Sequence, residues 1–215
     1  MRANGLDHSF AEYVADSTIH ILGVAAALVG ATALLVWAAF SAPPDTLPPL
    51  VAYVVGLIAT FSFSAAYNMT LHQPTRAVLR RFDHAAIFVM IAGTYTPLAF
   101  IGIGGAAGLR LAAAAWAIAV LGIILKLVFF HRFYRAVFLL YLIQGWLAVA
   151  AVLPMIRTLS PHVLGLILGG GILFTLGTIF HKHDNWPYNR AIWHGFVLVA
   201  AALHYLAILA MVSAA

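Results

Sequence analysis

Two pairs of polar residues stand four positions apart inside apolar segments, which puts each pair on one helix face, one turn apart. The pairs are Ser64 with Asn68 and Arg190 with His194, and Asp83 stands at the start of a third apolar segment. A carboxylate and an imidazole are donors that a divalent metal ion accepts, whereas a guanidinium forms an ion pair with a carboxylate. These five residues predict one polar site, provided that the three segments meet.

Each residue also has an ordinary structural interpretation. Asp83 would cap a helix at its N-terminus, where the helix dipole favours a carboxylate. Ser64 and Asn68 would hydrogen-bond to backbone groups, and Arg190 alone would anchor a helix at a membrane surface. His194 is harder to account for, although a histidine inside a membrane is more often a hydrogen-bonded packing residue than a metal ligand.

Two further histidines, His20 and His204, lie within apolar segments, where each needs a hydrogen-bonding partner or a hydrated pocket. His204 cannot share a metal ion with His194. Ten residues of helix at a rise of about 1.5 Å separate the two along the axis by about 15 Å, far more than one coordination sphere.

The composition defines the elements that must position these residues. Of 215 residues, 64% are hydrophobic and 8% are charged, and there is no cysteine. A soluble domain carries about 25% charged residues, so a soluble fold is excluded, as are disulfides and thiolate metal sites. The basic residues stand in short connections between apolar runs, and no phosphate-binding or hydrolase motif occurs, so we expect neither nucleic acid nor nucleotide as a partner.

A bilayer core of about 30 Å requires about 20 helical residues, and seven apolar stretches reach that length. We predict an all-α membrane protein with a cytoplasmic N-terminal segment at residues 1–17 and a single seven-helix transmembrane domain at residues 18–213. The predicted spans are residues 18–40, 49–70, 84–103, 108–130, 134–156, 161–180 and 191–213.

The eleven Lys and Arg residues predict the orientation. Nine fall on the side of the N-terminus, and only Arg110 and Arg157 fall on the other side. The positive-inside rule therefore places the N-terminus in the cytoplasm and the C-terminus outside. Lys126 lies one turn inside the fourth span, and we expect its side chain to extend to the cytoplasmic head groups.

The segment RRFDHAAIFVMIAGTYTPLAF, residues 80–100, closely resembles the signature of the bacterial hemolysin III family, relatives of the progestin and adiponectin receptors and of alkaline ceramidases. FSFSAAYN, DSTIHILG and AIWHGFVLVAAALHY match further family segments in the right order. The resemblance implies a seven-helix bundle with an inner N-terminus in the bacterial plasma membrane. It also implies a zinc site made of Ser and His four apart, Asp, and His-x-x-x-His.

This sequence departs from that zinc pattern at two of the three histidines. Ser64, Asp83 and His194 match, but Asn68 and Arg190 replace the other two. His194 and Asp83 remain as candidate metal ligands, fewer than the three protein donors of a zinc site, so a metal-free site is favoured. We expect Arg190 to take the place of the metal and pair with Asp83.

The resemblance suggests three classes of function. The favoured one is a non-catalytic membrane protein linked to membrane homeostasis or membrane permeabilisation, with membrane lipids as partners. The second is a zinc-dependent lipid amide hydrolase, which the missing ligands disfavour, and no catalytic residue is identified. The third is an ion channel or transporter, and few acidic residues lie deep in the spans to support it. The sequence does not predict the oligomeric state.

Overall fold

The chain folds into helices along one axis, as a backbone in hydrocarbon must when it satisfies its hydrogen bonds within each segment. The computed structural model describes residues 9–130 and 132–214. Within these ranges seven helical stretches are long and apolar enough to cross a membrane, which confirms the predicted number. The α-helices are α1 (Phe10–Ser41), α2 (Leu47–Met69), α3 (Gln73–Pro97), α4 (Gly105–Val128), α5 (Tyr134–Gly145), α6 (Val152–Thr158), α7 (Pro161–Lys182) and α8 (Asn189–Val212).

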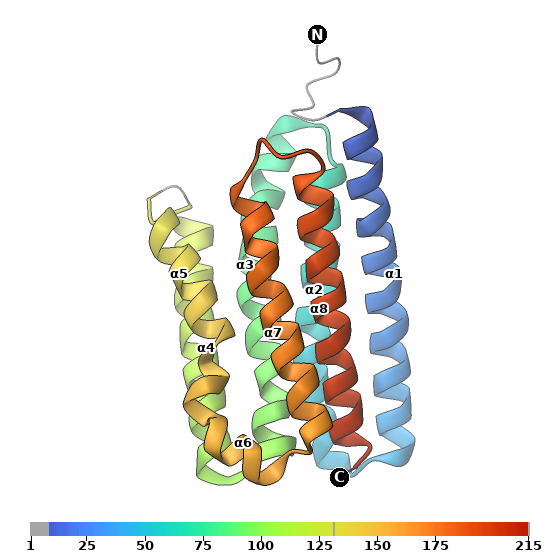
Figure 1. Cartoon of the computed structure of the whole chain (residues 1–215), viewed down its shortest axis with the longest axis vertical. Coiled ribbons are helices and arrows are strands. Elements are labelled where there is room, and N and C mark those ends of the chain that lie inside the picture. Colours follow the sequence, from blue (N-terminus) through green and yellow to red (C-terminus); the bar gives the residue numbers. More distant parts are fainter. Residues whose placement is uncertain (1–8, 131, 215) are drawn as a thin grey trace.

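The helices form one bundle, in which α1 begins at the end opposite to that at which α8 ends (Figure 1). In this view α7 and α8 lie in front of α2 and α3, α1 flanks α8, and α4 and α5 form the other side. We call the end at which α1 begins the amino end. Because the helices alternate in direction, α2 ends there, and α3 and α8 begin there.

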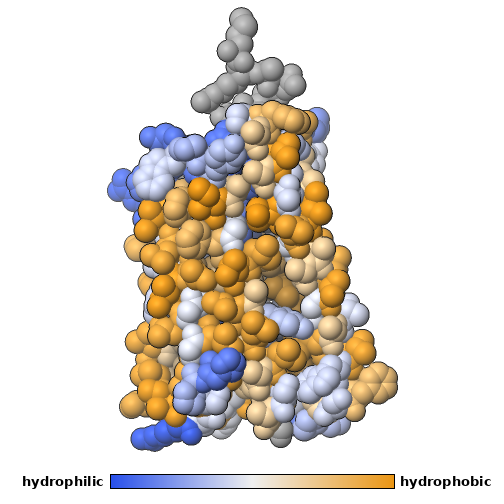
Figure 2. Space-filling model, turned by 45° about the vertical axis from the view of Figure 1, so that its right-hand side comes forward, coloured by the Kyte–Doolittle hydropathy of each residue, from blue (hydrophilic) through white to orange (hydrophobic). Residues whose placement is uncertain are grey.

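Many small residues pack in the interior, beside a few large buried ones such as Tyr53 and Phe88, and many large apolar residues face outward. Ala31, Ala38, Ala115 and Ala119 are at most 2% exposed, whereas Val29 is 70% exposed. Figure 2 shows hydrophobic side chains along most of one face, with hydrophilic ones gathered toward both ends. Lipid solvates large apolar side chains, and small ones let helices approach closely, so this arrangement is that of an integral membrane protein.

The first helix begins earlier than the predicted span. The sequence analysis starts this span at Thr18, but α1 begins at Phe10 because Ser9 and Glu12 form a capping box. The Ser9 hydroxyl accepts from the Glu12 amide at 3.3 Å, and the Glu12 carboxylate accepts from the Ser9 amide at 2.8 Å. These bonds satisfy amides that the first turn leaves free. Residues 1–8 of the predicted N-terminal segment lie outside the described residues.

Helices α2 and α3 approach each other through two glycines. A Cβ on Gly56 would lie 2.9 Å from the Val89 carbonyl oxygen, and a Cβ on Gly93 would lie 2.8 Å from the Ala52 carbonyl oxygen. No side chain fits at either place, so the two backbones are in direct contact. This contact fixes the position of Asp83 on α3 relative to the end of α2.

The fifth span is broken near its middle, where the sequence predicts one continuous helix. A short 3-10 segment, Leu147–Ala151, separates α5 from α6. The Tyr95 hydroxyl donates to the Gly145 carbonyl at 2.8 Å and accepts from the Ala148 amide at 2.9 Å. The Trp146 indole donates to Thr175 on α7 at 3.1 Å. Tertiary hydrogen bonds thus satisfy groups that the break releases, as membrane depth requires.

Candidate functional site

The polar residues singled out from the sequence line one cavity. This cavity has a volume of about 660 Å³ and lies between α2, α3, α5, α6, α7 and α8, with Lys126 contributed by α4. Its lining includes all five members of the predicted cluster, namely Ser64, Asn68, Asp83, Arg190 and His194. They lie toward the amino end, because α2 ends and α3 and α8 begin there. The structure therefore brings the three predicted segments together around one space.

The residues from α2 and α3 are already hydrogen-bonded. The Asn68 side-chain amide donates to the Ser64 carbonyl oxygen at 3.0 Å, within its own helix. The Ser64 hydroxyl in turn hydrogen-bonds to the Asp83 carboxylate. Asp83 lies well inside α3, which begins at Gln73, so the interpretation of this residue as a helix cap is wrong.

The predicted pairing of Arg190 with Asp83 is also wrong. In the part of the chain that the structure describes, neither side chain has an ionic partner within 4.0 Å. The positive charges that act on Asp83 come from Arg80 on its own helix and from Lys126 on α4. Arg190 lines the cavity together with Asp83, but its side chain does not reach that carboxylate.

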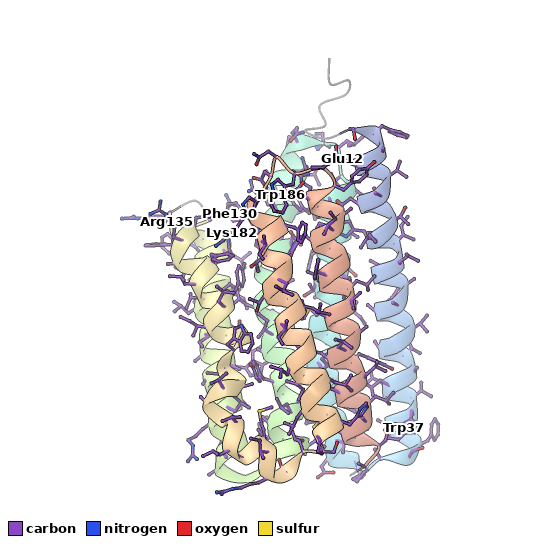
Figure 3. All side chains as sticks on the ribbon, viewed as in Figure 1. Glu12, Trp37, Phe130, Arg135, Lys182 and Trp186 are labelled. Atoms are coloured by element: carbon purple, nitrogen blue, oxygen red, sulfur yellow. The ribbon has the colours of Figure 1, made fainter. Side chains whose placement is uncertain are left out.

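Lys126 is buried instead of extending to the membrane surface. Only 2% of it is exposed, and it lines the cavity. Its ammonium lies 4.9 Å from the ring centroid of Phe130 and 5.8 Å from that of Tyr134, at cation–π distances. Lys182 on α7 lies in the same way 4.1 Å from the Phe138 ring of α5. Figure 3 shows Phe130 and Lys182 near each other toward the amino end.

A second polar cluster joins α1 to α8. The Asp16 carboxylate lies 2.6 Å from Nδ1 of His194, and its other oxygen lies 3.6 Å from Nε2 of His20. Asp16 and His20 are 7% and 3% exposed. Their spacing of four residues puts both on the face of α1 toward α8, and the His20 and His194 rings lie 4.3 Å apart. One donor atom from each of the three residues lies within 4.8 Å of the others, a group that could hold a metal ion.

Two contacts near the amino end hold the first turns of α1 in place. The Tyr188 amide, just before α8, donates to the Glu12 carboxylate at 2.9 Å. The Tyr13 hydroxyl donates to the Met69 carbonyl at the end of α2 at 3.4 Å. Figure 3 shows Glu12 at this end, near Trp186 of the α7–α8 connection. The start of α1 is thereby fixed to both α2 and α8, which positions Asp16.

His204 stands apart from both clusters. One of its ring nitrogens lies 3.2 Å from the Ile167 carbonyl oxygen on α7, and its ring packs beside Phe174 at a centroid distance of 5.6 Å. His204 thus has a hydrogen-bonding partner, as its position inside a span requires. It also contributes to the cavity lining, farther from the amino end than His194.

Sequence reasoning missed Asp16 as a member of a site. Asp16 lies in the predicted N-terminal segment, residues 1–17, because the apolar stretch starts after it. Two signals were available: the capping pattern of Ser9 and Glu12 starts the helix before Asp16, and Asp16 stands four residues before His20. His20 was recognised as a buried histidine in need of a partner, and its neighbours are Asp16 and His194.

The zinc ligands implied by the family resemblance do not fit a metal ion here. The Asn68 amide is hydrogen-bonded within its own helix, and Arg190 brings a permanent positive charge to the position of a ligand. Of that set, only His194 and Asp83 are strong donors, and His194 is already bonded to Asp16. Two donors are fewer than a zinc site requires.

A seven-helix bundle with a lipid-facing apolar exterior and buried polar groups at one end defines an integral membrane protein. The chain belongs to the haemolysin-III-related family, whose model matches residues 10–205.

Among its relatives, hemolysin-3 of Bacillus cereus is 34% identical over 198 residues, which cover 92% of this chain and 90% of that protein. A hemolysin-3 homolog of Bacillus subtilis (strain 168) is 33% identical, covering 92% and 93% of the two chains. The human monocyte to macrophage differentiation factor is 27% identical, covering 92% and 83%. The crystal structure of thermophilic rhodopsin superposes with a TM-score of 0.66 over 96% of both chains, at 14% identity, which is a similarity of fold alone.

Proposed function

We propose that this protein binds a single-chain membrane lipid with an anionic head group, and that it serves membrane homeostasis without catalysing a reaction. The observation that carries the proposal is the cavity of about 660 Å³, within the range of about 300–1,000 Å³ typical of ligand sites. On α8 its lining extends from Asn189 to Met211. At about 1.5 Å per residue this is about 33 Å, so the cavity is long and narrow, like an extended acyl chain.

The lining changes from polar to apolar along this length. Near the amino end it includes the cations Arg80, Lys126 and Arg190 and the acids Asp83 and Asp184. Farther along, apolar residues predominate in the lining, although His204 also contributes to it, and the apolar residues on α8 there include Ala207 and Ile208. Cations outnumber acids at the polar end, and a carboxylate or phosphate head group would balance the charge.

Apolar residues of the lining also supply an entrance from the bilayer. Val149, Val152 and Ile156 on the broken fifth span, and Leu168 on α7, both line the cavity and are 44–61% exposed. The outer surface of the bundle at this depth faces lipid. A lipid would enter sideways between the two spans, without first passing through water.

Two glycines of α7 allow a matched test. Gly171 lines the cavity and Gly165 does not, and a Cβ at either position would meet no atom within 4 Å. Gly171→Leu should therefore fill the cavity without a backbone clash, and Gly165→Leu should change only the outer surface. Binding of a fluorescent long-chain fatty acid to the detergent-purified protein would measure the difference. We expect at least a tenfold weaker affinity for Gly171→Leu and an unchanged affinity for Gly165→Leu; equal affinities would refute the proposal.

The proposed location is the bacterial plasma membrane, with the amino end in the cytoplasm. The positive-inside rule supports this orientation, since most basic residues stand in connections at the amino end. The chain has no cysteine, so single cysteines report topology directly. In intact spheroplasts a membrane-impermeant maleimide should label Ser160→Cys, between α6 and α7, but not Gln73→Cys at the start of α3. The reverse labelling would overturn the orientation.

Hydrolysis of the bound lipid is the second candidate, and one contact favours it. His194 lines the cavity and is held at 2.6 Å by the Asp16 carboxylate, an arrangement found in general bases. Assays with ceramide and fatty-acid amides would decide between binding and turnover. Turnover by the wild type that is lost in His194→Ala would favour hydrolysis, and its absence would favour binding alone.

A further inference from the structure

Three donor groups of the α1–α8 cluster face one another, and of these only His194 also lines the cavity. Asp16, His20 and His194 each offer one ligand atom within 4.8 Å of the other two. Two of them come from adjacent turns of α1 and the third from α8, so helix packing fixes their relative positions. The inference drawn from them does not depend on whether the cavity binds a lipid.

The ring of His20 supplies a second, independent observation. Its Nε2 atom is buried and has no hydrogen-bonding partner. The nearest carboxylate oxygen of Asp16 is 3.6 Å away, too far for a hydrogen bond. Buried polar atoms are nearly always paired, so this nitrogen, pointing at a carboxylate and a second imidazole, indicates a missing partner.

The spacing of the donors suits a small cation. Donors of a tetrahedral zinc ion with bonds of about 2.0 Å lie about 3.3 Å apart. Here Oδ1 of Asp16 lies 2.6 Å from His194 and Oδ2 lies 3.6 Å from His20, so each imidazole faces a different carboxylate oxygen. One ligand atom from each of the three residues lies within 4.8 Å of the others, and a cation would replace the proton shared by Asp16 and His194 and draw the donors closer together.

We infer that Asp16, His20 and His194 bind one divalent transition-metal cation, such as Zn²⁺ or Fe²⁺. Two imidazoles and one carboxylate are a ligand set for either metal, and both ions then keep open coordination positions. This set shares only His194 with the set that the family resemblance implies.

Some nearby charges attract such a cation and others repel it. Asp16 supplies a full negative charge, and the Asp83 carboxylate acts on His20 from α3. Arg190 acts on His194 with the opposite sign. Because His194 also lines the cavity, the cation lies beside it, and its open positions are accessible to water or to a bound head group.

Elemental mass spectrometry of the detergent-purified chain, expressed with added zinc and iron, tests the inference. We expect about one metal ion per chain in the wild type, at least a tenfold loss in His20→Ala, and retention in Asp83→Asn. His204→Ala, at a part-buried histidine of α8 outside the cluster, serves as the matched control and should retain the metal. Absence of metal from the wild type would overturn the inference, as would loss in Asp83→Asn with retention in His20→Ala.

A measurement on the wild type alone covers the case in which His20→Ala fails to fold. X-ray absorption at the edge of the bound metal counts imidazole ligands through multiple scattering. The proposed set predicts two imidazoles, whereas the set implied by the family resemblance contains only one in this sequence. A spectrum with one imidazole would refute the proposed ligands, and a spectrum with two would support them.

Discussion

The hydrogen bond between Asp16 and His194 should make a measurable contribution to stability even without a metal. The two atoms lie 2.6 Å apart, and the side chains of His194 and Asp16 are 14% and 10% exposed, so water screens the interaction little. Hydrogen bonds to charged groups contribute about 1.5–3 kcal/mol, and removing one partner of a buried pair costs about 3–5 kcal/mol. We expect Asp16→Ala and His194→Ala each to lower the free energy of unfolding by about 3 kcal/mol.

The double variant should lose only about 4 kcal/mol, because neither partner is then left buried and unpaired, so the coupling energy is about 2 kcal/mol. Unfolding by sodium dodecyl sulfate in mixed micelles, with excess chelator to remove metal, measures all four proteins. Asp16→Ala combined with His204→Ala is the control cycle, because distant residues without shared partners have additive effects. A coupling below about 0.5 kcal/mol between Asp16 and His194 would refute the reasoning.

Three further substitutions test other parts of the structure. Gly56→Val should lower the free energy of unfolding by about 1–3 kcal/mol, because the added side chain overpacks against α3. Gly195→Val should leave it unchanged, because a Cβ there meets no atom within 4 Å. Unfolding in mixed micelles compares the two variants. Ser9→Ala should cost about 1 kcal/mol and speed hydrogen exchange of the first amides of α1, and unchanged exchange would contradict the cap. Lys126→Met should weaken binding of a fatty acid about tenfold but leave binding of the neutral monoacylglycerol unchanged, as fluorescence titrations would show.

The number of spans could be predicted from the sequence because a membrane-spanning helix is recognisable by its length and its apolar composition. The sequence analysis does not predict the break between Gly145 and Val152, although Gly145 ends α5 and Pro154 in the first turn of α6 has no amide to donate to the Ala150 carbonyl. The break depends on the Tyr95 hydroxyl and on Thr175, which approach from α3 and α7. These hydrogen bonds join residues that are far apart in the sequence, so no local sequence pattern predicts them.

For the site, helix direction was enough to predict that Ser64, Asp83 and His194 lie near one end. The partners within that end were not predictable, because a residue's depth does not determine the direction in which its helix faces. Arg190 and Asp83 share a depth but are not paired, whereas Asp16 contacts His194 across an interface that the sequence does not specify.

The two walls of the cavity differ in how firmly they are joined. Helices α2 and α3 are in direct backbone contact at Gly56 and Gly93. They can therefore move apart only as whole, unbent helices. Across the opening, the contacts described between the fifth span and α7 are side-chain contacts, the Trp146–Thr175 hydrogen bond and the Lys182 ammonium over the ring of Phe138. Changes in bilayer thickness or lateral pressure will therefore deform the bundle unevenly. On the proposed function, such deformation should act first on α5 and α6, which flank the proposed lipid entrance.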